Sequence, residues 1–353
     1  MNLYRSNTYM KDLDDVIHAF GWLKNFEGKS VFVTGATGLI CSGIVDLLLR
    51  YSELHNNSIL VYGAGRNREK WEMRFSGYAD SGILKFVPYN AGQQNQLDFH
   101  ADYIIHGAGN AYPKLIQKHP IDTMTANFSG MLELLEHASG HPAVKTVFIS
   151  SSEVYGKKSS GEPFREEEHG YIDILNPRAS YGVGKMAAET LCASYASERN
   201  IQVSIVRPGH IYGPTAGRED NRVSSMFAYD VLEGKDIVLK SDGSQIRSYC
   251  YVLDCATAVL KVLLEGKSGD AYNISNPQSI LSIREIAELF AEWGKSRLRF
   301  EIPEGVEKAA FNPMQNSSLN SEKLQSLGWE GVFDARRGTE TTVKVLEECH
   351  ALL

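Results

Sequence analysis

Short apolar strands alternate with amphipathic helices over residues 29–207. The β-branched run Ser30–Thr34 is followed by a glycine-bearing turn and a helical stretch from Ile44 to Arg50. Strands interleaved with helices in this way predict an α/β fold built on a doubly wound parallel sheet. The alternation continues with strands at Ser58–Tyr62, Leu84–Val87, Tyr103–His106, Thr146–Ser150 and Val203–Arg207, and with helices at Arg68–Phe75, Met124–Ala138 and Tyr181–Glu198.

Different patterns flank this alternating region. Apolar side chains recur at helical spacing from Leu13 to Phe26, whereas mixed helices and short strands follow Pro214. We therefore predict a helical N-terminal extension over residues 1–28 and a Rossmann-type nucleotide-binding domain over residues 29–207. Residues 208–353 are predicted to form mainly a smaller C-terminal α/β lobe that binds the substrate.

Composition narrows the range of functions. The 353 residues are 43% hydrophobic and 22% charged with a net charge of −7, which argues against general binding to nucleic acid or to anionic membranes. No apolar run approaches the roughly 20 residues of a membrane-spanning helix, and no signal-peptide segment is evident at the start of the chain. These features predict a cytoplasmic protein. Its five cysteines include no CxxC pair, so we expect reduced thiols and no metal site.

A glycine-rich turn directly follows the first strand and opens a helix, which is the context of a dinucleotide-binding motif. Gly35 permits the tight turn, and Gly38 lets backbone N–H groups approach a pyrophosphate at the positive end of the helix. Cys41 stands where this pattern usually has a third glycine, and it is small enough for close packing. The residues of the turn predicted to bind the cofactor are Gly35, Thr37, Gly38, Leu39 and Ile40.

The end of the second strand leaves NAD and NADP both open as cofactors. An acidic residue there binds the ribose hydroxyls of NAD, but this chain has Gly65-Arg66-Asn67. Arg66 can pair with the 2′-phosphate of NADP or stack on the adenine. Further cofactor contacts are predicted from residues at the ends of later strands, namely Asn90, Ala108, Gly109 and Pro208.

Tyr181 and Lys185 lie four residues apart and therefore on one face of a predicted helix. A phenol with a pKa near 10 is a weak base at neutral pH unless a cation stabilises its anion. Lys185 and a positively charged nicotinamide ring can provide that cation. Ser151 lies upstream at the end of a strand, where its hydroxyl can hold the reacting oxygen of a substrate.

The glycine-rich turn, the segment with Ser151 and the Tyr181–Lys185 pair follow one another in this order along the chain. In this they resemble the extended short-chain dehydrogenase/reductases of the NAD-dependent epimerase/dehydratase family, which act on nucleotide-sugars. By the order of its motifs, the resemblance spans Lys29 to Leu327. It implies Ser151 as the catalytic hydroxyl, Tyr181 as the base and Lys185 as its partner. Glu153 is implied as a fourth catalytic residue.

The residues around the catalytic serine bear on the type of reaction. dTDP-glucose 4,6-dehydratases carry Thr-Asp-Glu here and use the aspartate as an acid, whereas this chain has Ser152 in that place. UDP-glucuronate decarboxylases carry a Thr/Ser-Ser-Glu arrangement like this one, and so do GDP-mannose 4,6-dehydratases. Segments around Arg178, Arg222 and Arg247 resemble those with which the decarboxylases hold the uronate and the diphosphate. His210 departs from the asparagine usual in the family, which leaves the sugar open.

The resemblance therefore implies an enzyme that oxidises C4 of a nucleotide-sugar with bound NAD(P), most like a UDP-glucuronate decarboxylase. A 4-epimerase or 4,6-dehydratase remains open, as does an NADPH-dependent keto-sugar reductase. A non-catalytic dinucleotide sensor is disfavoured, because Ser151, Tyr181 and Lys185 are all present. The family also implies a homodimer through the helices at Phe128–Ala138 and Ala187–Ala196, whose apolar residues suffice for such contact.

Overall fold

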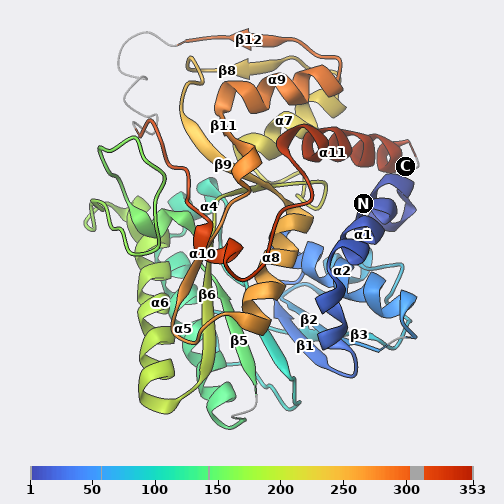
Figure 1. Cartoon of the computed structure of the whole chain (residues 1–353), viewed down its shortest axis with the longest axis vertical. Coiled ribbons are helices and arrows are strands. Elements are labelled where there is room, and N and C mark those ends of the chain that lie inside the picture. The colour runs from blue at the N-terminus through green and yellow to red at the C-terminus, as the bar shows by residue number, and fades with distance from the viewer. Residues whose placement is uncertain (1, 57, 142–143, 303–313, 352–353) are drawn as a thin grey trace.

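The computed structural model describes residues 2–56, 58–141, 144–302 and 314–351, and its centre is a seven-stranded parallel sheet (Figure 1). The strand order is β10-β6-β5-β4-β1-β2-β3, which confirms the predicted doubly wound architecture. The order reverses between β1 and β4, and a ligand crevice is expected at the carboxyl ends of those strands. The strands are β1 (Ser30–Thr34), β2 (Leu60–Gly65), β3 (Leu84–Pro88), β4 (Tyr103–His106), β5 (Lys145–Ile149), β6 (Gln202–Pro208) and β10 (Ala271–Ile274).

Helices cover both faces of this sheet, and the alternation of side chains along β1 shows how. Val31 and Val33 join the apolar cluster that contains α2 and α8, whereas Phe32 joins the cluster beneath α5 and α6. Each face of the strand is thus buried against a different layer, as a parallel sheet requires. The helices of this region are α2 (Leu39–Leu54), α3 (Arg68–Arg74), α4 (Pro113–Lys118), α5 (Pro120–Ser139), α6 (Ser180–Arg199) and α8 (Val252–Glu265).

A smaller lobe lies above the carboxyl edge of the sheet in Figure 1. It contains a three-stranded sheet in the order β11-β9-β7 and a parallel pair, β12-β8. Its strands are β7 (His210–Tyr212), β8 (Ile237–Leu239), β9 (Ile246–Tyr251), β11 (Ile280–Ser282) and β12 (Leu298–Phe300), and its helices are α7 (Val223–Leu232), α9 (Ile283–Trp293) and α11 (Ala335–His350). The short helix α10 (Glu322–Gln325) lies instead against β10 of the large sheet.

Part of the chain after residue 207, the predicted end of the nucleotide-binding domain, joins the large sheet. β10 returns from the second half of the chain to extend the large sheet and pairs with β6 through Ala271 and Ile205. α8 packs against α2 and also contacts β5 and β6. This helix is buried nearly all round, so it has no polar face to turn to solvent and needs cover on every side.

The N-terminal extension is helical as predicted, but with other bounds. It consists of η1 (Leu3–Arg5), α1 (Asn7–Ala19) and the 3-10 segment η2 (Gly21–Phe26), instead of one helix over Leu13–Phe26. Ser6 caps α1 by accepting a hydrogen bond from the backbone N–H of Tyr9 at 3.0 Å. The early start therefore comes from a capping serine, which the apolar periodicity does not reveal.

Two carboxylates, the buried Asp46 and the partly buried Glu348, fasten this extension to both lobes. The hydroxyls of Tyr4 and Tyr9 each donate to Asp46 of α2 at 2.6 Å, and Arg74 pairs with the same carboxylate. Glu348 of α11 accepts a hydrogen bond from the Ser6 hydroxyl at 2.6 Å. The extension therefore bridges the nucleotide-binding domain and the C-terminal helix.

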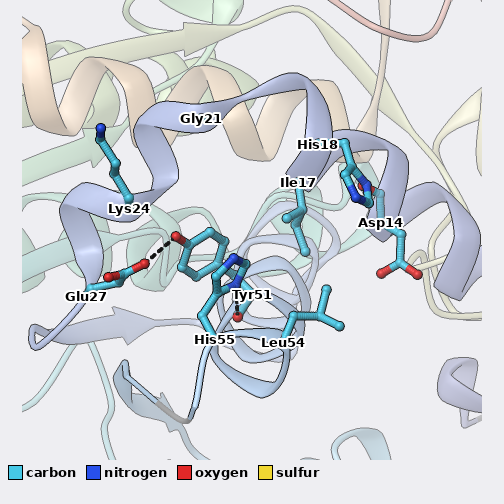
Figure 2. Close-up of a pocket in the computed structure, with 9 residues that line it drawn as sticks. All are labelled: Asp14, Ile17, His18, Gly21, Lys24, Glu27, Tyr51, Leu54 and His55. Carbon is cyan, nitrogen blue, oxygen red and sulfur yellow. Dashed lines mark hydrogen bonds between the residues drawn. The ribbon is translucent and has the colours of Figure 1, made fainter.

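A hollow of about 520 Å³ lies between the extension and α2, and Figure 2 shows the side chains that line it. Across it, the Tyr51 hydroxyl donates to Glu27 at 2.6 Å, and the Tyr51 ring stacks on His55 with centroids 4.0 Å apart. None of the predicted catalytic or cofactor-binding residues lines this hollow. Most of those residues lie instead just beyond the ends of β1, β2, β3, β4 and β5. Among the described residues, no helix is long and apolar enough to cross a membrane, and all five cysteines are free and buried.

Candidate active site

The glycine turn forms a cradle that fits a dinucleotide phosphate. Gly35 has φ 69°, and a Cβ there would lie 2.9 Å from both the Ala108 Cα and the Gly107 oxygen. Gly38 is the N-cap of α2, so the unpaired N–H groups of the first helical turn face this space. These donors stand at the positive end of the helix and at the strand-order reversal, where a pyrophosphate binds. Thr37, Leu39 and Ile40 belong to the same turn.

Gly107 makes room for Cys41, the residue that stands in place of the third glycine of the motif. The buried Cys41 sulfur occupies the space that a Cβ at Gly107 would need, so the close approach of the two segments depends on that glycine. Beside it, the Thr34 hydroxyl accepts hydrogen bonds from the N–H groups of Gly107 and Ala108 at 3.2 Å each. The same hydroxyl contacts Nδ1 of His106 at 2.8 Å. This Thr34–His106 pair holds the loop with Ala108 and Gly109 against the glycine turn.

The Thr34–His106 pair was not predicted, although both residues end strands of the predicted sheet. Thr34 and His106 stand opposite each other at the carboxyl ends of adjacent strands β1 and β4. Because Thr34 accepts two N–H bonds, its own proton is directed to His106. Burial, with a smaller effect of the Lys185 charge, lowers the pKa of His106 to about 3, so the ring is neutral near pH 7.

The residues predicted for the adenosine end of the cofactor follow β2 and β3. Arg66 is exposed directly after β2 and forms no ion pair with the rest of the described chain. Asn90 lies just beyond β3, partly buried, and its side chain accepts a 3.4 Å hydrogen bond from Gly92. β2 and β3 are adjacent, so the two residues lie at one edge of the crevice. Pro208 ends β6 in the buried sheet. Their contacts with a cofactor stay predictions.

The structure brings the predicted catalytic residues together. Lys185 of α6 is buried and donates from Nζ to the carbonyl oxygen of Ile149 at 2.7 Å. The same Nζ lies 5.8 Å from the centre of the Tyr181 ring. Ser151 lies two residues after Ile149, and hydrogen bonding from its hydroxyl lowers the pKa of Tyr181. The hydroxyl, the phenol and the ammonium therefore meet where β5 ends.

Burial sets the proton affinities of this group. It raises the pKa of Tyr181 to about 12, the charge of Glu153 adds to this, and the hydrogen bond from Ser151 acts against it. Burial also lowers the pKa of Lys185 to about 8. An isolated phenol in this position is a poor base. The site therefore needs added positive charge before Tyr181 can take a proton.

Glu153 and Arg178 form an ion pair beside Tyr181. Two parallel hydrogen bonds of 2.9 Å join the guanidinium to the carboxylate, and both side chains are about two-fifths exposed. The resemblance assigned Arg178 to a sugar carboxylate. In the structure its charge is already matched by Glu153, so a sugar carboxylate would have to share or displace that partner. Ser152 lies next to Glu153, partly buried.

The C-terminal lobe contributes a buried arginine, Arg247. Arg247 is only 5% exposed and donates to the carbonyl oxygens of Ile246 at 2.8 Å and Met314 at 3.3 Å. It pairs with no carboxylate among the described residues. A buried guanidinium without a counter-charge is costly unless an anion arrives. This residue is therefore suited to a phosphate group.

His210 and Arg222 stand near Arg247. His210 pairs with Tyr249 across β7 and β9, so it lies on the same face of that sheet as Arg247, two residues away. Burial first, then the charges of Arg247 and Arg222, lower the pKa of His210 to about 3. Its buried Nδ1 has no partner within the described chain. Arg222 pairs with Asp220 and lies 5.6 Å from the ring centre of Tyr112.

A buried polar network behind the segment that carries Ser151 was also not predicted. Glu189 of α6 accepts hydrogen bonds from the Ser150 hydroxyl and from Arg207 of β6. Arg207 in turn donates to the Tyr155 hydroxyl at 2.9 Å. These contacts fix the segment that carries Ser151 against α6. Their sequence separation leaves no local signal.

Two comparisons of the sequence identify its family and its relatives. The model of the family described as "NAD dependent epimerase/dehydratase family" matches residues 31–275. UDP-glucuronic acid decarboxylase 6 of Arabidopsis thaliana is 30% identical over 87% of this chain and 86% of that protein. UDP-glucuronic acid decarboxylase 1 of Danio rerio is 28% identical over 92% of this chain and 74% of that protein.

Solved structures share the fold. A dTDP-glucose 4,6-dehydratase from Bacillus anthracis in complex with NAD has a TM-score of 0.76 at 21% identity, covering 92% of this chain and 98% of that chain. A UDP-glucuronic acid 4-epimerase from Bacillus cereus in complex with UDP-glucuronic acid and NAD has a TM-score of 0.74 at 22% identity, covering 91% and 99%. At these identities the likeness shows the architecture alone.

Proposed function

Because this chain belongs to the NAD-dependent epimerase/dehydratase family, we propose that it oxidises C4 of a nucleotide-sugar and decarboxylates UDP-glucuronate. The observation that carries the proposal is the meeting of Ser151, Tyr181 and Lys185 at the end of β5, opposite the glycine cradle. The decarboxylases among its relatives and the Ser-Ser-Glu sequence at residues 151–153 support this choice of reaction.

The proposed roles follow from the contacts. Tyr181 removes the proton of the sugar 4-hydroxyl while Ser151 hydrogen bonds to the same oxygen, and Lys185 stabilises the phenolate. Gly35, Gly38 and the first turn of α2 would hold NAD, which would supply the hydride acceptor for C4 and the source of the hydride that is returned. Arg247 binds a phosphate of the nucleotide.

Decarboxylation follows from the chemistry of the oxidised sugar. With a ketone at C4, the C5 carboxylate belongs to a β-keto acid, and the bond from C5 to the carboxyl carbon breaks as CO₂ leaves. The electron pair passes into an enolate on the C4 oxygen, C5 takes a proton, and C4 is reduced again. Arg178 is the cation placed to steer the carboxylate, provided that Glu153 yields part of its ion pair.

A 4-epimerase or 4,6-dehydratase is the second candidate, favoured by the ion pair between Glu153 and Arg178. With Arg178 matched by Glu153, the site offers less attraction for a uronate, and the Glu153 carboxylate is the group that would accept a C5 proton. A sugar with CH₂OH at C5 would then be dehydrated, or its C4 centre inverted. A keto-sugar reductase that consumes NADPH is a further alternative.

A substrate panel tests the proposal. The purified protein is incubated separately with UDP-glucuronate, UDP-glucose and GDP-mannose, and products are followed by NMR without added reductant. We expect CO₂ and a UDP-pentose from UDP-glucuronate. A 4-keto-6-deoxy product or a C4 epimer instead selects the second candidate, and the absence of turnover with every nucleotide-sugar overturns the proposal.

The cofactor preference is a separate part of the proposal. NAD is the cofactor of the family, but β2 ends without an acid, and the unpaired Arg66 suits a 2′-phosphate. We therefore propose that the chain tolerates NADP as well as NAD. An Arg66→Asp change should weaken NADP binding by roughly tenfold or more, given the worth of a charge-assisted hydrogen bond, and spare NAD, as measured by titration of both nucleotides.

We also propose a homodimer through α5 and α6. Met124 and Phe128, one helical turn apart on α5, and Met186 on α6 are 36–41% exposed, and together they offer an apolar face. Phe128→Glu should shift the molecular mass measured by light scattering to that of one chain. A monomeric wild-type protein would exclude this arrangement.

A further inference from the structure

We propose that residues 213–222 form a strap that retains the cofactor, with Thr215, Lys70 and Glu219 as its positioning residues. The inference rests on the proposed function, since it concerns the dinucleotide that the glycine cradle would hold. The strap lies between β7 and α7 and contacts elements along the carboxyl edge of the large sheet. We name it the cofactor strap.

The first anchor joins the strap to the pyrophosphate cradle. The hydroxyl of Thr215, which is buried, donates to the carbonyl oxygen of Leu39 at 2.9 Å. Leu39 is the first residue of α2 and directly follows Gly38. A residue of the C-terminal lobe therefore reaches the helix end that would bind the phosphates. Behind it, the Tyr229 hydroxyl donates to the Ala216 oxygen at 2.8 Å and backs the strap with α7.

The second anchor lies at the adenosine end. Lys70 of α3 pairs with Glu219 of the strap at 2.5 Å, and both side chains are 53% exposed. α3 follows β2, whose carboxyl end holds the ribose in folds of this kind. The pair thus crosses from the nucleotide-binding domain to the other lobe, whereas the neighbouring pair Arg68–Glu72 stays within α3.

The third anchor lies toward the catalytic end. Asp220 is buried and pairs with Arg222, whose guanidinium lies over the ring of Tyr112. The charge of Arg222 also lowers the pKa of Tyr181. The three anchors therefore join the strap to other elements near the expected positions of the adenosine, the pyrophosphate and the nicotinamide. The proposal is that a cofactor in the crevice leaves only when some of these contacts open.

Retention of the cofactor matters for a cycle that returns hydride to the same sugar. If the reduced cofactor left before hydride returned, the keto-sugar would be stranded. A strap fastened at several points slows this loss without touching the reacting atoms. The proposal therefore predicts an effect on cofactor exchange that does not depend on catalysis.

Charge reversal across the second anchor tests the strap. Holoenzyme is loaded with radiolabelled NAD⁺ and transferred to excess unlabelled NAD⁺, and the rate of label loss is measured for Lys70→Glu, Glu219→Lys and the double reversal. Each single change should speed exchange about two- to fivefold, as expected for an exposed ion pair, and the double reversal should restore the wild-type rate. Glu72→Gln on α3 is the matched control and should leave the rate unchanged.

Thr215→Val removes the buried anchor with little change of shape and should speed exchange by roughly three- to tenfold. Wild-type exchange rates in both the single reversals and Thr215→Val would overturn the strap, as would a double reversal that fails to recover. These outcomes leave the proposed function standing. A wild-type protein that holds no labelled NAD⁺ would instead overturn the proposed function and the strap together.

Discussion

Burial and neighbouring charges together set the pKa of Tyr181. Burial raises its pKa, Glu153 raises it further, and Arg178 and Arg222 lower it. Tyr181 acts as a base only after losing its proton, so activity should rise with pH through its pKa. Glu153 and Arg178 therefore act on the same titration with opposite signs.

Glu153→Gln should move the rising limb of kcat/KM to lower pH, because it removes a negative charge that raises the pKa of Tyr181. Arg178→Gln should move the same limb to higher pH. The position of the limb is the readout, since either change can also alter the height of the profile. Limbs that coincide with the wild type in both variants would contradict the role given to Tyr181.

Arg247 is expected to lower the stability of the fold, because its charge is buried without a carboxylate partner in the described chain. Arg247→Met keeps most of the side-chain volume but removes a buried charge that has no carboxylate partner in the described chain. Calorimetry should show UDP binding weakened about 10- to 100-fold, from the roughly 1.5–3 kcal/mol of a charge-assisted hydrogen bond. The thermal midpoint should be equal or higher. Arg284→Met, which breaks an exposed pair with Glu288 in the same lobe, should leave UDP affinity unchanged. Unchanged affinity in Arg247→Met would place the phosphate elsewhere.

At the scale of elements, the glycine turn depends on the strand beside it. Cys41 and Gly107 share one space, in which the cysteine sulfur sits where a Cβ on the partner would be. The first turn of α2 and the end of β4 are therefore fitted to each other as a pair.

Gly107→Ala should lower the free energy of unfolding by about 1–3 kcal/mol through overpacking and should weaken NAD binding. Adding Cys41→Gly should recover part of both losses, because the double change returns the space to the new methyl group. Urea denaturation and NAD titration give the two readouts. A double variant that is as impaired as Gly107→Ala alone would show that the two residues do not compete for this space.

Local patterns predicted the elements that carry chemistry and failed where distant segments meet. The strand-turn-helix motif and the Tyr181–Lys185 spacing are set by neighbouring residues, so both were visible in the sequence. The pair of Glu153 with Arg178 and the pairing of β10 with β6 join segments far apart in the chain. Apolar periodicity says which face of an element is buried, but not which partner covers it.

Over the whole molecule, the N-terminal extension ties the two lobes together. Tyr4 and Tyr9 hydrogen bond to Asp46 of the nucleotide-binding domain, and Ser6 bonds to Glu348 of the last helix. Its helical character was visible in the sequence, but its contacts were not, since each joins distant residues. The extension is thus part of the folded core.

Tyr9→Phe should lower the free energy of unfolding by roughly 1–3 kcal/mol, because it takes a hydrogen bond from the buried carboxylate of Asp46. Chemical denaturation measures this loss. Tyr171→Phe serves as the control, since Tyr171 is 70% exposed and should change stability little. Equal stability of both variants would mean that the extension is not held as described.

The central claim is that hydride leaves C4 of a nucleotide-sugar and returns to it within one turnover. UDP-glucuronate labelled with deuterium at C4 tests this claim most directly, with turnover rate and product label measured together in the presence of excess unlabelled NAD⁺. The account predicts slower turnover than with the unlabelled sugar and deuterium retained at C4 of the product. Turnover without an isotope effect, or deuterium found in the free cofactor, would contradict it.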